Sequence, residues 1–134
     1  TDLQGRTQVT QAQIAERYAV NDKAPTTILV TSDGMGKADQ ELQHKLIKTY
    51  LTLLNENEYL PSVIAFYTDG IKLLTTGSPV LEELKALEAK GVRLIACGTC
   101  LDYFGLDDDL QAGLRGGMTD IIEAQWRAEK VITL

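Results

Sequence analysis

Residues 92–100 read VRLIACGTC, an apolar run that ends abruptly at a cysteine and a glycine. A short run of aliphatic residues bounded by turn residues is typical of a strand buried in the interior of a parallel sheet. Gly91 stands just before the run and is typical of the residue that follows a helix. The segment therefore predicts a helix, then a strand over 92–96 that Cys97 terminates, then a turn into the next element.

A regular alternation of strand and helix patterns begins near Thr26 and continues to the end of the chain. Short runs rich in β-branched residues predict strands at 27–31, 62–67, 92–96 and 130–133, with a short extra strand at 71–74. Longer runs with apolar residues three or four apart predict helices at about 38–57, 78–90 and 119–128, with a broken helical region at 101–112. Gly113, Gly116 and Gly117 predict a loop.

This alternation predicts an α/β fold with three layers, in which helices cover both faces of a mainly parallel sheet of about four to five strands. Two details of the helices follow from the sequence. Ser78 is expected to cap the helix at 78–90, with Pro79 as its first residue. The helix at 38–57 is expected to bury one apolar stripe, which comprises Leu42, Leu46, Ile47, Tyr50, Leu53 and Leu54.

The length of 134 residues suits one domain. We assign the domain to residues 25–134. Residues 1–24 are polar and rich in glutamine, and they are interpreted as an N-terminal arm or linker. Thr10 and Gln13 have the spacing of a capping box, which predicts a short helix over about 11–19.

Net charge and apolar content exclude several classes of partner. The formal net charge is −6 and the isoelectric point is about 4.7, so the surface is expected to repel nucleic acid and anionic lipid. No apolar run approaches the roughly 20 residues that a membrane helix needs. Two cysteines do not make a secreted disulfide framework, and no secretory signal pattern is visible, so a cytoplasmic location is expected.

Cys97 and Cys100 are the only cysteines, and they stand three residues apart. This spacing in a cytosolic α/β chain is typical of redox or metal chemistry, although two inert buried thiols remain the alternative. The amides of Gly98 and Thr99 follow the strand where a helix is expected to begin. Unpaired amides at that position lower a thiol pKa, so Cys97 is predicted to be held as a thiolate.

Zinc binding and thioredoxin-like exchange are weaker interpretations of the same pair. A structural zinc site needs four ligands, and His44 is expected on the solvated face of its helix. A four-cysteine site shared across a dimer is the remaining route to zinc. Thioredoxin-like motifs follow an early strand, whereas this pair lies near residue 100. No metal and no cofactor are therefore expected.

The loop that follows the first strand carries Gly34-Met35-Gly36. It holds only the first two glycines of a dinucleotide-binding fingerprint, because Asp39 stands where the third would be. The carboxyl ends of parallel strands meet at one edge of the sheet, so we interpret this loop as a backbone wall of a pocket beside Cys97.

Two further patterns have structural interpretations. Asp107, Asp108 and Asp109 precede an apolar segment and are expected to cap a short helix rather than to bind metal. Trp126 lies one helical turn after Ile122 and two after Met118, which predicts core packing or, if the stripe is exposed, a contact between subunits.

The sequence resembles the DsrE/DsrF-like sulfurtransferase family, and within it the branch of sulfurtransferase-like selenium metabolism proteins. The resemblance extends from about Thr27 to Leu134 and is most specific over residues 90–106, KGVRLIACGTCLDYFGL. The segments at 32–36, 69–73, 77–81 and 130–132 also fit. It implies a small three-layer domain with a parallel sheet and homo-oligomeric assembly.

In family members that carry sulfur, a cysteine at the end of the corresponding strand holds the cargo, and that position matches Cys97. The resemblance therefore implies a sulfur transfer protein, with selenium as an alternative cargo, that exchanges a Cys97 persulfide with donor and acceptor proteins or small sulfane-sulfur compounds. Cys100 has no counterpart in the relay members and is interpreted as a resolving or tuning thiol. The alternative function is a redox-sensing or binding module that uses the Cys97/Cys100 pair without moving sulfur.

Overall fold

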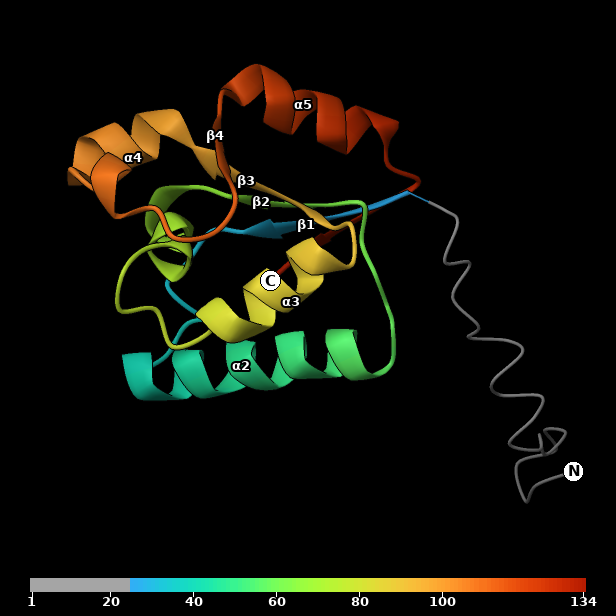
Figure 1. The fold of residues 1–134 in the computed structure, drawn as a ribbon, viewed down its shortest axis with the longest axis horizontal. Coiled ribbons are helices and arrows are strands. Elements are labelled where there is room, and N and C mark those ends of the chain that lie inside the picture. The colour runs from blue at the N-terminus through green and yellow to red at the C-terminus, as the bar shows by residue number, and fades with distance from the viewer. Residues whose placement is uncertain (1–24) are drawn as a thin grey trace, which may run out of the picture.

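The computed structural model describes residues 25–134 (Figure 1). The predicted helix over 11–19 and the proposed arm at 1–24 lie outside the described residues.

A five-stranded parallel sheet forms the centre of the described part of the chain (Figure 1). Its strands are β1 (Thr26–Val30), β2 (Val63–Phe66), β3 (Arg93–Cys97), β4 (Leu114–Gly116) and β5 (Lys130–Thr133). They lie in the order β4-β3-β2-β1-β5, and each pair of neighbours is parallel. The buried runs of β1, β2 and β3 occupy the middle, as their near-continuous apolar sequences predict.

The helices lie on both faces of this sheet (Figure 1), which confirms the predicted three-layer α/β fold. One face carries α2 (Gln40–Glu56) and α3 (Leu81–Ala89), and the other carries α4 (Gly98–Phe104) and α5 (Met118–Arg127). Two 3₁₀ helices complete the described elements, η1 (Thr68–Leu74) after β2 and η2 (Asp107–Asp109) after α4. Gly91 follows α3 with φ +97°, the left-handed conformation that ends helices and favours glycine.

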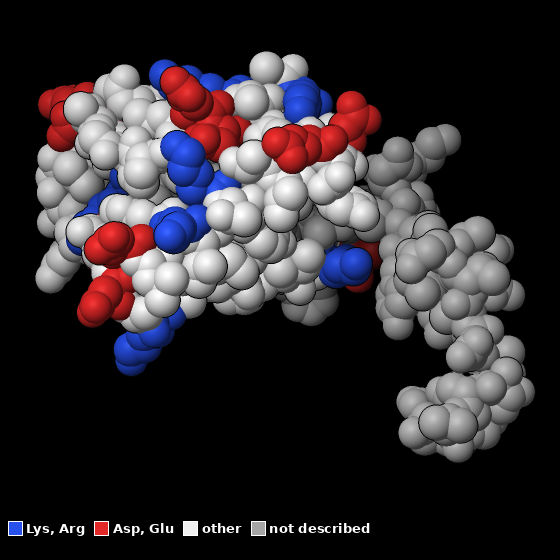
Figure 2. Space-filling model, turned by 90° about the horizontal axis from the view of Figure 1, so that it is seen from below, with Lys and Arg blue, Asp and Glu red and all other residues white. Residues whose placement is uncertain are grey.

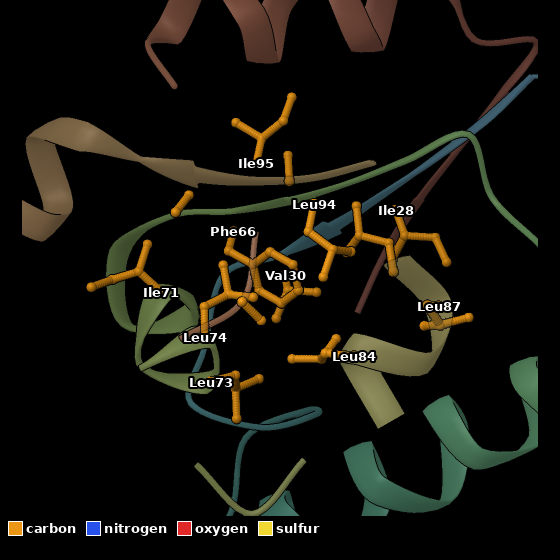
Figure 3. Close-up of a cluster of buried hydrophobic side chains, with 14 of the residues drawn as sticks. Ile28, Val30, Phe66, Ile71, Leu73, Leu74, Leu84, Leu87, Leu94 and Ile95 are labelled. Atoms are coloured by element: carbon orange, nitrogen blue, oxygen red, sulfur yellow. The ribbon is translucent and has the colours of Figure 1, made fainter. Parts of the chain in front are cut away.

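Successive residues of β3 point to opposite faces of the sheet. Figure 3 shows Leu94 directed into the cluster with Phe66 and Leu84, while Ile95 points the other way, toward the layer that carries α5. All four side chains are buried. Because β3 is buried on both faces, it holds the chain that leads into Cys97 in a fixed position.

Two predicted elements differ in type from the observed ones. The segment 71–74, predicted as a strand, belongs to η1, in which Ile71, Leu73 and Leu74 are all buried. A 3₁₀ turn lets these neighbouring apolar residues face the core together, whereas a strand would have turned Lys72 and Leu74 to one face and Leu73 to the other. The predicted glycine loop contains β4, which pairs with β3 from Ile95↔Leu114 to Cys97↔Gly116.

Two details of the predicted helices were also wrong. The N-cap of α3 is Val80, and the Ser78 hydroxyl instead accepts a hydrogen bond of 3.2 Å from the Val80 amide before the helix starts. On α2 the buried residues are Ile47, Leu51 and Leu54, while three leucines of the expected stripe are exposed. These exposed residues are Leu42, Leu46 and Leu53.

The face seen in Figure 2 carries acidic and basic side chains that are scattered and not separated into a field of one sign. The negative net charge is therefore not concentrated into one acidic patch on that face. None of the helices within residues 25–134 combines the length and apolar character that crossing a bilayer requires.

Candidate functional site

The carboxyl ends of the central strands lie side by side, as the sequence predicts. Val30 of β1 is aligned with Phe66 of β2, and Phe66 is aligned with Ala96 of β3. The residues that follow these strands therefore share one edge of the sheet. Cys97 is the last residue of β3, and α4 begins at the next residue.

The two cysteines lie close together but differ in exposure. Both are free thiols, and they lie close enough that Cys97 contributes to the pKa of Cys100. Cys97 is only 3% exposed and belongs to the hydrophobic core, whereas Cys100, in the first turn of α4, is partly exposed. The pair therefore has one sulfur inside the protein and one at its surface.

Thr68 supplies the backbone donor that reaches this pair. Its N–H donates a hydrogen bond of 3.1 Å to Sγ of Cys100. Its φ is +51°, which is uncommon for any residue with a side chain and costs about 1 kcal/mol or more. The Thr68 hydroxyl holds this conformation, because Oγ1 lies 2.6 Å from the Thr31 carbonyl oxygen at the end of β1. An uncommon backbone conformation thus directs an amide at a sulfur.

Burial of the Cys100 side chain and its hydrogen bond with Cys97 raise the pKa of the Cys100 thiol, and the N–H of Thr68 opposes this shift. The Cys100 sulfur accepts the hydrogen bond from Thr68, so that contact favours the thiolate, whereas burial and Cys97 favour the neutral thiol.

Arg115 of β4 covers the turn between the cysteines. A side chain on Gly98 would lie 2.9 Å from the Arg115 guanidinium carbon, so the absence of a side chain at Gly98 makes room for the arginine. The guanidinium donates two hydrogen bonds to Asp102 of α4, at 2.7 and 2.8 Å, and one of 2.7 Å to Asp107. This pairing lowers the pKa of the Asp102 carboxyl. Arg115 thereby ties β4 to α4 and η2.

The predicted pocket residues are not all brought together. Gly98 is buried under Arg115, and Thr99 is exposed in the first turn of α4. Cys97 makes no side-chain capping hydrogen bond to that turn. The role predicted for these two amides thus stays a prediction, and the amide that contacts a cysteine sulfur is that of Thr68.

The glycine loop turns toward α2. Gln43 accepts a hydrogen bond of 3.1 Å from the Met35 amide and donates one of 2.9 Å from its side chain to the Gly36 carbonyl oxygen. At Gly34, φ is +140°, and a side chain would collide with Gln43. The Met35 amide is therefore not free to bind a ligand, and the pocket wall beside Cys97 remains a prediction for Gly34 and Gly36.

The residues weighed as metal ligands have other partners. His44 is partly buried, with Nε2 at 3.2 Å from Oδ1 of Asp33, and so it is not the fully solvated residue that its helix position predicts. Asp107 bonds Arg115, and Asp107–Asp109 themselves form η2 after Leu106, so they do not, as the sequence predicted, cap a helix in the segment that follows them. Within residues 25–134, no group of three or more His, Cys, Asp and Glu side chains is arranged to hold a metal ion.

Two surface features lie away from the cysteines. Trp126 is 85% exposed, and Met118 and Ile122 on the same side of α5 are also exposed, so this stripe does not pack into the core of the chain. A cavity of about 460 Å³ lies at the amino ends of the strands, where Thr27, Val63 and Arg93 line it. It is at the opposite edge of the sheet from Cys97.

Thr68 and Arg115 are the site residues that sequence reasoning missed. Thr68 directly follows the strand predicted at 62–67. Its position after a strand could have indicated that it lies near Cys97, because residues that follow parallel strands gather at one edge of the sheet. Arg115 gave no signal, since the segment around it was interpreted as a loop.

Fold and sequence together define the class of this protein. The sequence profile of the DsrE/DsrF-like family matches residues 25–134, so the chain belongs to that family. The comparison with curated proteins found no match.

Solved structures share the fold at low sequence identity. The ychN protein from E. coli superposes with a TM-score of 0.64 at 19% identity, covering 83% of this chain and 99% of that chain. The protein of unknown function MTH1491 from Methanobacterium thermoautotrophicum gives 0.63 at 21% identity, covering 84% and 100%. The conserved protein of unknown function BT1422 from Bacteroides thetaiotaomicron gives 0.56 at 15% identity, covering 81% and 94%.

Proposed function

We propose that the protein carries a sulfane sulfur as a persulfide on Cys97 and passes it to a partner. The observation that carries the proposal is a buried thiol at the carboxyl end of β3 that lies beside a second, partly exposed thiol. The family is linked to sulfur relay, which supports the same chemistry.

The reaction consists of two thiol displacements. In loading, the Cys97 thiolate attacks the outer sulfur of a persulfide, a new S–S bond forms, and the thiol that carried the sulfur leaves as a thiolate. In unloading, an acceptor thiolate attacks the outer sulfur of the Cys97 persulfide, and Cys97 leaves as a thiolate. The sulfane sulfur moves without net oxidation or reduction. Donors and acceptors are protein thiols or small sulfane-sulfur compounds, and selenium is the second cargo that the same displacement accommodates.

Burial of Cys97 suits a carrier. A persulfide on an exposed cysteine is open to reduction by other thiols in the medium, whereas a sulfur in the core meets only groups that the protein admits. The proposed order is therefore loading, protected storage and release to a partner.

The carrier function is tested by the final product of loading. Reduced protein is incubated with glutathione persulfide, washed with glutathione, and analysed by intact mass and by fragmentation of the peptide 94–115. We expect one added sulfur on Cys97 in the wild type and in Cys100→Ser, and no retained sulfur in Cys97→Ser. Retention of the sulfur at another residue would contradict the assignment.

A redox-sensing module is the second candidate, and the closeness of two free thiols favours it. In that function the pair forms a reversible disulfide and no sulfur is carried. The same mass measurement separates the two, because the redox function predicts a loss of two hydrogens and no added sulfur.

We also propose that the protein assembles with copies of itself, as its family membership suggests. The exposed stripe of Met118, Ile122 and Trp126 on α5 supports this, because aromatic residues and methionine are enriched at protein interfaces. Sedimentation of the wild type over a range of concentrations tests the proposal.

A further inference from the structure

The two cysteines differ in how accessible their sulfur atoms are to a donor in solution. A displacement at sulfur requires the donor sulfur to approach the attacking sulfur in line with the bond that breaks. Cys97 is 3% exposed, so a donor in solution has almost no access to it. Cys100 is partly exposed on α4 and lies against Cys97. The surface thiol is therefore the one that a donor meets first.

One contact of Cys100 favours negative charge on a departing sulfur, against the burial and the nearby Cys97 that raise the pKa of its thiol. The N–H of Thr68 donates to Sγ of Cys100 at 3.1 Å. Its direction is fixed in advance, because the hydroxyl of Thr68 is bonded to the Thr31 carbonyl oxygen while φ is held at +51°. A donor that is already oriented stabilises charge as it develops and needs no rearrangement at the moment of reaction.

We propose that Cys100 is the entry thiol, which accepts the sulfane sulfur from the donor and delivers it to the buried Cys97. This inference rests on the proposed carrier function and adds the route by which the sulfur reaches its site of storage. It also gives a role to Cys100, which the two displacements on Cys97 leave without one.

The two steps balance. First, the Cys100 thiolate attacks the outer sulfur of the donor persulfide, and the donor leaves as a thiolate. Second, the Cys97 thiolate attacks the outer sulfur of the Cys100 persulfide, and the Cys100 S–S bond breaks. Cys100 leaves as a thiolate that accepts a hydrogen bond from the Thr68 N–H. Cys97 loses its proton before the attack, and Cys100 takes up a proton after it leaves. No electrons are gained or lost by the pair.

The order of labelling tests this route. The full chain is mixed with glutathione persulfide, quenched with iodoacetamide at times from milliseconds to minutes, and digested with trypsin. Cleavage after Arg93 and Arg115 leaves both cysteines on one peptide, and its fragment ions distinguish sulfur on Cys97 from sulfur on Cys100. We expect wild-type sulfur to appear on Cys100 first and then to move to Cys97.

Variants make the test independent of any single substitution. In Cys97→Ser and Cys97→Ala, we expect sulfur to be trapped on Cys100 when the glutathione wash is omitted. In Cys100→Ser and Cys100→Ala, we expect loading of Cys97 to slow by at least about tenfold, because the intramolecular step is lost, while the final occupancy is unchanged. Tyr103→Phe is the matched control on α4, since it changes an exposed side chain and leaves both thiols in place.

Each outcome bears on one of the two proposals. Wild-type loading rates in both Cys100 variants, or label on Cys97 before Cys100, would overturn the entry role and leave the carrier function intact. Release of hydrosulfide with loss of two hydrogens would overturn the second step, because Cys97 would then have attacked the inner sulfur and formed a disulfide. Absence of added sulfur on the wild type at every time would sink the carrier function, and the entry role with it.

Discussion

The backbone N–H of Thr68 donates a hydrogen bond of 3.1 Å to the sulfur of Cys100, and this bond joins the start of η1 to the first turn of α4. A second contact joins the same two regions, because Lys72 of η1 lies 4.5 Å from the centre of the Phe104 ring at the end of α4. The position of Cys100 therefore depends on η1 as well as on its own helix. The site is a product of three neighbouring strand ends and not of the CxxC segment alone.

Thr68→Val should raise the pKa of the Cys100 thiol. The substitution keeps the shape of the side chain but removes the hydroxyl that is bonded to Thr31, so the amide is less firmly directed at the sulfur. Because the N–H lowers this pKa, a weaker bond moves alkylation of Cys100 by iodoacetamide to higher pH. The free energy of unfolding should fall by about 1 kcal/mol.

Thr76→Val is the control for that experiment. It also removes a threonine hydroxyl bonded to a carbonyl oxygen, that of Asp109 at 3.3 Å, but no cysteine is involved. We expect its alkylation profile to match the wild type. A Thr68→Val profile that stays in place or moves to lower pH would show that the Thr68 amide does not stabilise the Cys100 thiolate.

Cys97→Ala should lower the pKa of Cys100. Burial is the largest cause of the raised pKa and remains in the variant, but the hydrogen bond and the charge interaction with Cys97 are both removed. Alkylation of Cys100, followed by mass spectrometry of the peptide 94–115, should therefore begin at lower pH than in the wild type. A shift to higher pH would mean that Cys97 stabilises the Cys100 thiolate, which is the opposite of the arrangement described above.

Gly70→Ala should destabilise the fold by about 3 kcal/mol, because the added methyl group would collide with the carbonyl group of Val30. The cost comes from backbone contact, since φ at Gly70 is not positive. Gly77→Ala is the matched control: its φ is +89° and the space around it is open, so only the conformational cost of about 1 kcal/mol is expected. Urea denaturation measures both, and equal losses would show that η1 yields to the collision.

The sequence predicted the strands and the position of Cys97 because β1, β2 and β3 are buried on both faces and their apolar runs are local signals. β4 gave no such signal, since Leu114–Gly116 is short and lies among glycines, and it becomes a strand only by pairing with β3. The segment 71–74 was misassigned for a related reason. Its apolar residues fit several conformations, and the packing of η1 against α3, α4 and β3 selects the 3₁₀ helix.

The candidate site was predicted in part for the same reason. The CxxC spacing is local, so Cys97 and Cys100 could be found from the sequence. The donor to Cys100 is 32 residues away, and its direction depends on an uncommon φ that threonine does not signal. In the glycine loop, Gly34 and Gly36 have positive φ values, which a glycine in a sequence can indicate. The loop is bonded to Gln43 of α2, and the sequence does not reveal that contact.

Arg115→Gln should reduce stability at neutral pH and have less effect in acid. Asp102 has its pKa lowered by the hydrogen bonds of Arg115, so the pair contributes stability above the ordinary carboxyl pKa of about 4. That contribution is lost as the pH falls through the lowered pKa of the folded state. The difference in melting temperature between wild type and variant should therefore shrink below about pH 4, and any difference that remains reports lost packing over Gly98.

Arg127→Gln is the control for the arginine experiment. Arg127 forms one exposed ion pair with Glu123 four residues earlier, at 3.3 Å, and such pairs contribute little. Its melting temperature should follow the wild type at each pH. An Arg115→Gln difference that stays constant from neutral to acid pH would show that the ion pairs with Asp102 and Asp107 are not the source of the stability.

Trp126→Glu should weaken self-association without destabilising the chain. The indole is 85% exposed, so its replacement removes few contacts within the chain, and the free energy of unfolding under conditions that give monomers should change by less than about 0.5 kcal/mol. If the stripe on α5 forms the contact between copies, a carboxylate in that contact must be desolvated without a partner, which opposes assembly. Sedimentation velocity should show smaller species than the wild type at the same concentration. Gln125→Glu adds the same charge beside the stripe and should assemble like the wild type. A wild type that sediments as a monomer, or a Trp126→Glu variant that assembles fully, would remove α5 as the interface.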